Sequence, residues 1–114
     1  MPLDEAYLNF TYIQKSLSQL ETIWKVPMHD FTLLRDKKDN VYLRKFVESD
    51  GESEFYILFR VDAKQVIALT QGSMSAKEAF EHCVTDLFYV LAISTKTGSM
   101  SMELVDKEDI EEFI

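Results

Sequence analysis

Several residue types are scarce in this chain of 114 residues, and each scarcity excludes a class of protein. The single cysteine, Cys83, cannot form an internal disulfide, so a reducing compartment is expected. One cysteine and two histidines cannot supply the four ligands of a structural zinc site without help from carboxylates. The three glycines stand singly, which excludes a glycine-rich phosphate-binding loop. We therefore predict neither a metal nor a cofactor.

Long hydrophobic runs are also missing, since no stretch approaches the ~20 apolar residues that cross a bilayer. The N-terminus has acidic residues early and lacks a basic segment followed by an apolar core, so we predict no signal peptide. We expect a cytoplasmic protein without membrane contact. Apolar residues make up 46% of the chain, which is enough for one core in a single domain spanning residues 1–114.

Basic residues are outnumbered by acidic ones, 12 to 20, for a net charge of −8. Residues 46–114 hold fourteen acids and five bases, whereas residues 1–45 have a net charge of +1. Non-specific nucleic-acid binding is disfavoured, because it depends on lysine and arginine neutralising phosphates. A basic protein partner would be attracted; the alternative is that the charge serves solubility. The predicted partner-binding residues are Glu48, Asp50, Glu52, Glu54, Glu103, Asp106, Glu108, Asp109, Glu111 and Glu112.

The clearest local pattern lies between two apolar segments and predicts a pair of short helices. Asp62 followed by Gln65 is typical of a helix start, and Gly72 is typical of a helix end. Ser75 followed by Glu78 forms a capping-box pattern that starts a second helix. The apolar side of the first helix is expected to consist of Val61, Val66, Ile67 and Leu69.

This segment resembles a small family of uncharacterised bacterial domains. In that family a strand meander precedes a helix–Gly–x–Met/Ile–Ser–helix segment. The resemblance implies strands from about residue 31 to residue 59, and it leaves the N-terminal segment outside. It implies no activity, because the family provides none to transfer. The matching residues are Gly72, Met74, Ser75, Glu78, Ala79 and Phe80.

Alternation with a period of two predicts strands from residue 31 onward. In residues 41–48, Val47 is expected on one face with Val41, and Glu48 on the other face with Tyr42. The Asp-Gly pair at 50–51 predicts a hairpin. Residues 54–61 and 87–95 are apolar on both faces, as in central strands, and residues 100–105 close the meander. Residues 22–26 fit either a short strand or an extended linker, and residues 107–114 a last short helix.

Residues 4–22 have apolar side chains every three or four positions, which predicts an N-terminal helix. Its apolar side is wider than one sheet would cover. We therefore slightly favour a homodimer with Tyr7, Leu8 and Tyr12 in its interface over a monomer. The predicted fold is α+β, with this helix packed on a mainly antiparallel sheet of about five strands. A short helix pair is inserted in it, and a short helix ends the chain.

Candidate catalytic residues are few. His29 lies in a predicted turn, and His82 adjoins Cys83, but neighbours on a helix point about 100° apart. We therefore lean against an enzyme. The leading hypothesis is a non-enzymatic, bacterial or phage protein-binding module that masks or bridges a partner, as immunity proteins and defence inhibitors do. The alternatives are a small-ligand sensor domain and a minimal enzyme that uses a histidine.

Overall fold

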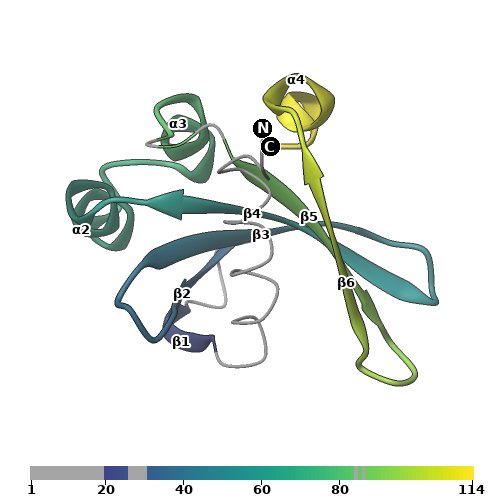
Figure 1. Cartoon of the computed structure of the whole chain (residues 1–114). Coiled ribbons are helices and arrows are strands. Elements are labelled where there is room, and N and C mark those ends of the chain that lie inside the picture. Colours follow the sequence, from purple (N-terminus) through teal and green to yellow (C-terminus); the bar gives the residue numbers. More distant parts are fainter. Residues whose placement is uncertain (1–19, 26–30, 84, 86) are drawn as a thin grey trace, which may run out of the picture.

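The computed structural model describes residues 20–25, 31–83, 85 and 87–114, and it contains a six-stranded antiparallel sheet (Figure 1). The strands lie side by side in chain order, so each one pairs with its neighbours in sequence. A helix pair separates β4 from β5, and a short helix with a 3-10 turn follows β6. The elements are β1 (Glu21–Lys25), β2 (Phe31–Arg35), β3 (Val41–Ser49), β4 (Ser53–Val61), α2 (Ala63–Gln71), α3 (Ala76–Glu81), β5 (Phe88–Ser94), β6 (Met100–Val105), α4 (Lys107–Ile110) and η2 (Glu111–Phe113).

The predicted fold class is wrong in two respects. The sheet has six strands rather than about five, because the segment around Trp24 is a strand, β1, and not a linker. The predicted N-terminal helix packed on the sheet is not supported. Most of that segment lies outside the described residues, and its last two residues, Glu21 and Thr22, belong to β1. Thr22, Ile23 and Trp24 are β-branched or aromatic, which favours a strand over a continued helix.

One face of the sheet is covered by α2, α3 and α4, which all lie on the same side in Figure 1. The core between these layers contains Leu69 of α2, Phe80 of α3 and Ile110 of α4. Phe80 packs against Phe59 and Phe88 of the sheet, with ring centroids 5.7 and 5.1 Å apart. Each aromatic side chain buries a large apolar area, so this cluster anchors the helix pair to β4 and β5.

The opposite face of the sheet has a second buried cluster of Leu34, Tyr42, Leu58, Tyr89 and Leu91. These residues alternate along the strands with those of the first core, as expected for central strands that are apolar on both faces. Burial raises the pKa of Tyr89 to about 12, so its hydroxyl stays protonated at neutral pH. The prediction that residues 54–61 form a central strand is therefore confirmed by β4.

The helix pair forms by the local chemistry that the sequence predicts. Asp62 accepts a hydrogen bond from the Gln65 backbone N–H at 2.8 Å, and the Gln65 side chain accepts one from the Asp62 N–H at 3.0 Å. Ser75 and Glu78 make the same reciprocal pair at 3.1 and 3.2 Å. Gly72 ends α2 with φ = 80°, a left-handed conformation that glycine adopts with little strain.

The turn between β2 and β3 is built around a buried carboxylate that sequence reasoning missed. Asp36 is 4% exposed and accepts four hydrogen bonds: from the backbone N–H of Lys38 and Asn40, the Asn40 side chain and the Tyr42 hydroxyl. Burial acts to raise the pKa of Asp36, but these donors outweigh it and hold the pKa below its usual value. Burial and Asp36 together raise the pKa of Tyr42. The turn between β2 and β3 thus has a charged centre.

Candidate protein-binding surface

A mainly apolar pocket of about 230 Å³ opens between the C-terminal helix and the sheet. Ile110, which is 4% exposed, anchors α4 against the sheet, and Phe113, which is 46% exposed, lies at the solvent side. Two carboxylates, Glu48 and Asp109, share the pocket with these apolar side chains. The full lining is Val47, Glu48, Phe55, Ile57, Val90, Val105, Asp109, Ile110 and Phe113.

Glu48 faces this pocket because β3 contains a β-bulge. The pairing of β3 with β4 steps from Phe46 opposite Tyr56 to Glu48 opposite Phe55, so one residue of β3 is extra. Directly opposite residues share a face, which places Glu48 on the side of Phe55 and of the pocket. Regular alternation predicted Glu48 on the face of Tyr42, and that prediction is wrong. The extra residue in β3 shifts the alternation by one position.

Asp109 reaches the pocket from the short helix α4. Its carboxylate accepts a hydrogen bond from the Asp106 backbone N–H at 3.3 Å, which holds the side chain at the start of the helix. The sequence predicts a helix at 107–114 after Asp106, and α4 with η2 confirms it. Because Ile110 follows directly and points into the core, the position of Asp109 beside the apolar pocket is fixed by the same short helix.

The charge around the pocket is strongly negative. Residues 100–114 contain six acidic residues and one lysine, for a net charge of −5. That lysine, Lys107, points away: its Nζ donates to the Glu81 carbonyl at 3.2 Å and lies 5.3 Å from the centre of the Phe80 ring. Within the described part of the chain, none of the ten predicted acidic residues forms a salt bridge. Their negative charges are therefore not neutralised by ion pairs among the described residues.

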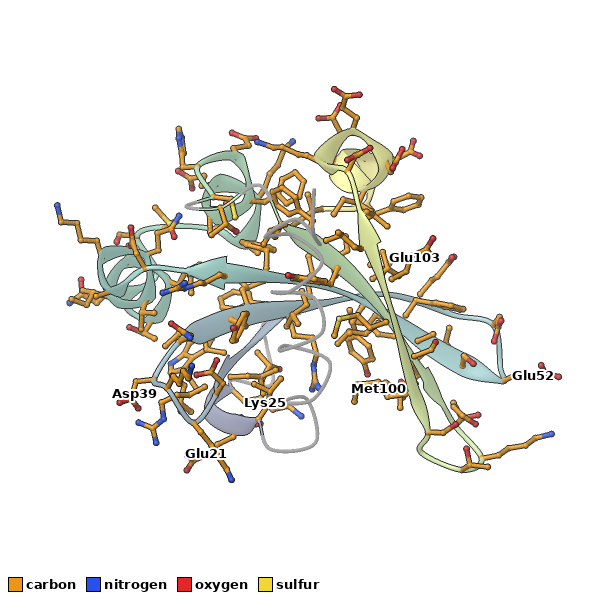
Figure 2. The ribbon with its side chains drawn as sticks, viewed as in Figure 1. Glu21, Lys25, Asp39, Glu52, Met100 and Glu103 are labelled. Atoms are coloured by element: carbon orange, nitrogen blue, oxygen red, sulfur yellow. The ribbon has the colours of Figure 1, made fainter. Side chains whose placement is uncertain are left out.

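The structure brings only some of the ten predicted acidic residues together. Glu103 lies opposite Val90, which lines the pocket, so Glu103 is on the pocket face of β6 (Figure 2). Glu54 follows the other alternation of β4 and lies on the opposite face. Glu111 and Glu112 line a separate hollow of about 410 Å³ with Lys77 and Lys107. Asp106 and Glu108 are exposed on and beside α4.

Asp50 and Glu52 lie in the turn between β3 and β4, away from the pocket lining. Asp50 accepts hydrogen bonds from the backbone N–H groups of Ser53 and Glu52, at 2.8 and 2.9 Å. Both hydrogen bonds lower the pKa of Asp50, and the bond from Ser53 has the larger effect. Asp50 thus stabilises the turn, while Glu52 is exposed at its tip (Figure 2). The predicted dimer residues Tyr7, Leu8 and Tyr12 lie outside the described residues.

The residues considered for catalysis are not assembled into a site by the described part of the chain. His82 is exposed at the end of α3, and His29 lies outside the described residues. Cys83 is partly buried, and its thiol lies 3.6 Å from the Arg60 carbonyl oxygen. No group of three or more His, Cys, Asp or Glu side chains among the described residues is placed to hold a metal ion.

Exposed apolar side chains on β6 were not singled out from the sequence. Met100 is 41% exposed and Leu104 is 37% exposed, and Met102 lies between them on the same face. A signal for them exists in the sequence, because residues 100–104 alternate apolar and polar and so place three apolar side chains on one face of a strand. Figure 2 shows Met100 on this outermost strand, below Glu103.

Comparisons with protein-family models, curated proteins and solved structures found no match to this chain. The resemblance of the Gly72–Phe80 segment to a bacterial domain family stays a prediction. Among the described residues, no helix is both long enough and apolar enough to cross a membrane. The pocket and the strands beside it are therefore the features of the molecule that bear on its function.

Proposed function

We propose that the protein is a non-enzymatic binding module that holds a basic segment of another protein and thereby masks it or bridges it to a further partner. The observation that carries this proposal is the pocket beneath α4, where Glu48 and Asp109 stand beside exposed Phe113. An apolar pocket with a few charged groups at its edge suits a side chain with an apolar stem and a cationic end, such as lysine or arginine.

The charge distribution supports the same partner. The net charge of −5 on residues 100–114 would attract a basic surface over a distance of about 10 Å at moderate salt. The apolar lining would contribute affinity that salt does not screen. The proposed place of action is the cytoplasm, in line with a sequence whose one cysteine cannot form a disulfide within the chain.

A pull-down from a bacterial lysate, followed by kinetics with the captured protein, tests the proposal. The double variant Glu48→Gln/Asp109→Asn removes both pocket charges and should weaken binding by about tenfold or more. The matched control Glu111→Gln/Glu112→Gln removes the same charge from the separate hollow and should mainly slow association. Equal affinities of the two variants would refute the role of the pocket. Capture of a small metabolite with no protein partner would favour the sensor alternative.

A further inference from the structure

The outer edge of β6 forms one end of the described sheet. β6 is the last strand of the sheet, and no described strand pairs with its outer side. Four of its six residues are exposed, including Met100 and Leu104. A strand at a sheet edge presents backbone N–H and C=O groups that lack a partner in the sheet, and these groups can pair with another extended chain.

The hydrogen-bond phase identifies the residues whose backbone groups point outward. The Ser94 N–H donates to the Ser99 carbonyl at 2.8 Å, at the mouth of the β5–β6 hairpin. In an antiparallel pair such bonds recur at every second residue, so Ser101, Glu103 and Val105 direct their backbone groups toward β5. Met100, Met102 and Leu104 therefore direct theirs outward. The Thr95 N–H, which donates to the Glu52 carbonyl at 2.9 Å, fits this alternation on the other side of β5.

The other edge of the sheet is protected, whereas β6 is not. β1 has a charged residue at each end, Glu21 and Lys25, and its pairing is interrupted by a bulge between Thr22 and Trp24. Charges and bulges are the usual features that prevent edge strands from pairing. β6 pairs with β5 without interruption over six residues, and it contains one charged residue, Glu103, and no proline.

We propose that β6 binds an extended segment of the partner as a seventh, antiparallel strand, and that this segment alternates basic and apolar side chains. This inference rests on the proposed function and names the partner's chemistry. Side chains opposite Met100, Met102 and Leu104 share their apolar face, so they would be apolar. The partner residues between these apolar ones would have their side chains on the opposite face, beside Glu103. These side chains would extend over the acidic pocket, so they would be lysine or arginine.

A second copy of this chain fits the edge less well. If two β6 strands paired about Met102, the two Glu103 side chains would be diagonal neighbours about 7–8 Å apart on one face. If they paired about Glu103, the two carboxylates would face each other directly. Like charges opposite one another destabilise a strand pair, and each chain also has a net charge of −8. A basic segment meets neither penalty.

The test uses a short peptide of alternating lysine and valine, with fluorescence anisotropy as the measurement and the full chain as the receptor. In the proposed pairing the valine amides face β6. Methylation of the backbone nitrogens of the valines should weaken binding by about tenfold or more. Methylation of the backbone nitrogens of the lysines should leave binding nearly unchanged. A peptide of the same composition, with lysines and valines in separate blocks, is the sequence control. Equal binding by the two methylated peptides, or no binding of the unmethylated one, overturns the proposal.

A variant of the protein tests the same edge from the other side. Met102→Pro removes an outward N–H but no bond to β5, so the fold should be kept while peptide affinity falls about tenfold or more. Met102→Leu is the matched control and should bind like the parent. A parent dimer that Met102→Pro dissociates would assign the edge to a second copy and overturn the proposal. If Met102→Pro leaves binding unchanged but Glu48→Gln/Asp109→Asn weakens it, the edge fails while the proposed function stands.

Discussion

The turn between β2 and β3 and the C-terminal segment 100–114 both contain carboxylates, and they use them in opposite ways. In the turn, Asp36 is buried and accepts four hydrogen bonds from its own chain. In the C-terminal segment, Glu103 and Glu108 are exposed, and no acid of that segment forms a salt bridge in the described part of the chain. A carboxylate whose oxygens are satisfied inside contributes to stability, whereas one directed to solvent is available to a partner.

The largest effect expected from this contrast is on Asp36. Asp36→Ala removes the acceptor of four hydrogen bonds and leaves the Tyr42 hydroxyl and two backbone N–H groups without it. The free energy of unfolding should fall by about 3 kcal/mol, measured by denaturant titration. Glu108→Ala, on the exposed helix α4, is the control and should change it by less than about 0.5 kcal/mol. Equal losses of unfolding free energy in the two variants would show that the buried and the exposed carboxylate do not differ in their contribution to stability.

The pH dependence of stability should also identify Asp36. Its folded pKa is lower than the value of ~3.9 expected in the unfolded chain. Its contribution is therefore complete above that unfolded value and is lost as the pH falls through the folded pKa. The difference in free energy of unfolding between the parent and Asp36→Asn should shrink as the pH falls below about 4. Asp50, whose pKa is also lowered, is present in both proteins and cancels in the difference. A difference that does not change with pH would contradict the assignment.

Gly72 allows a test of a backbone conformation, in addition to the tests of carboxylates. It adopts φ = 80°, and a Cβ added there would meet no atom within 4 Å. The cost of Gly72→Val is therefore conformational rather than steric crowding, and we expect a loss of about 1–2 kcal/mol in thermal or chemical melts. Gly72→Asn is the control, because asparagine tolerates this conformation better, and it should lose less. Equal losses for valine and asparagine would show that the backbone conformation is not the cause.

The smallest effect on stability is expected at the exposed acids. Glu103→Gln and Glu108→Gln together should change the free energy of unfolding by less than about 0.5 kcal/mol. The same double variant should reduce the rate of association with a basic partner, and the reduction should fade at high salt. A lower free energy of unfolding for this variant than for the parent would show that the exposed C-terminal acids contribute to stability. That result would contradict their contrast with Asp36.

What could be predicted from the sequence was local. The caps at Asp62 and Ser75 and the end at Gly72 depend on residues within one turn of helix, so they are correct. Even there, two of the four residues expected on the apolar side of α2 are placed otherwise: Val61 belongs to β4, and Ile67 is 55% exposed. Val66 and Leu69 pack against the core. The local pattern identifies a helix more reliably than it identifies the face that packs.

What could not be predicted depends on pairing across the sheet. The bulge that turns Glu48 toward the pocket is visible only in the register of β3 against β4. The burial of Asp36 requires the turn to fold back over Tyr42, six residues away along the chain. The outward phase of Met102 follows from the hairpin at Ser94 and not from alternation alone. The sequence therefore predicted an excess of acidic residues in this part of the chain. It did not predict the pocket or which of these residues line it.

The sequential order of the strands affects how the sheet folds and how it opens locally. Hairpins with short connections close quickly, and only the junction of β4 with β5 must wait for the helix pair between them. β6 and α4 are joined to the sheet through β5 and a few core contacts such as Ile110, so they can open together without disturbing the central strands. Amide hydrogens of β6 should exchange with solvent well before those of β4. The strand proposed to receive a partner would then also leave the native sheet before the central strands do.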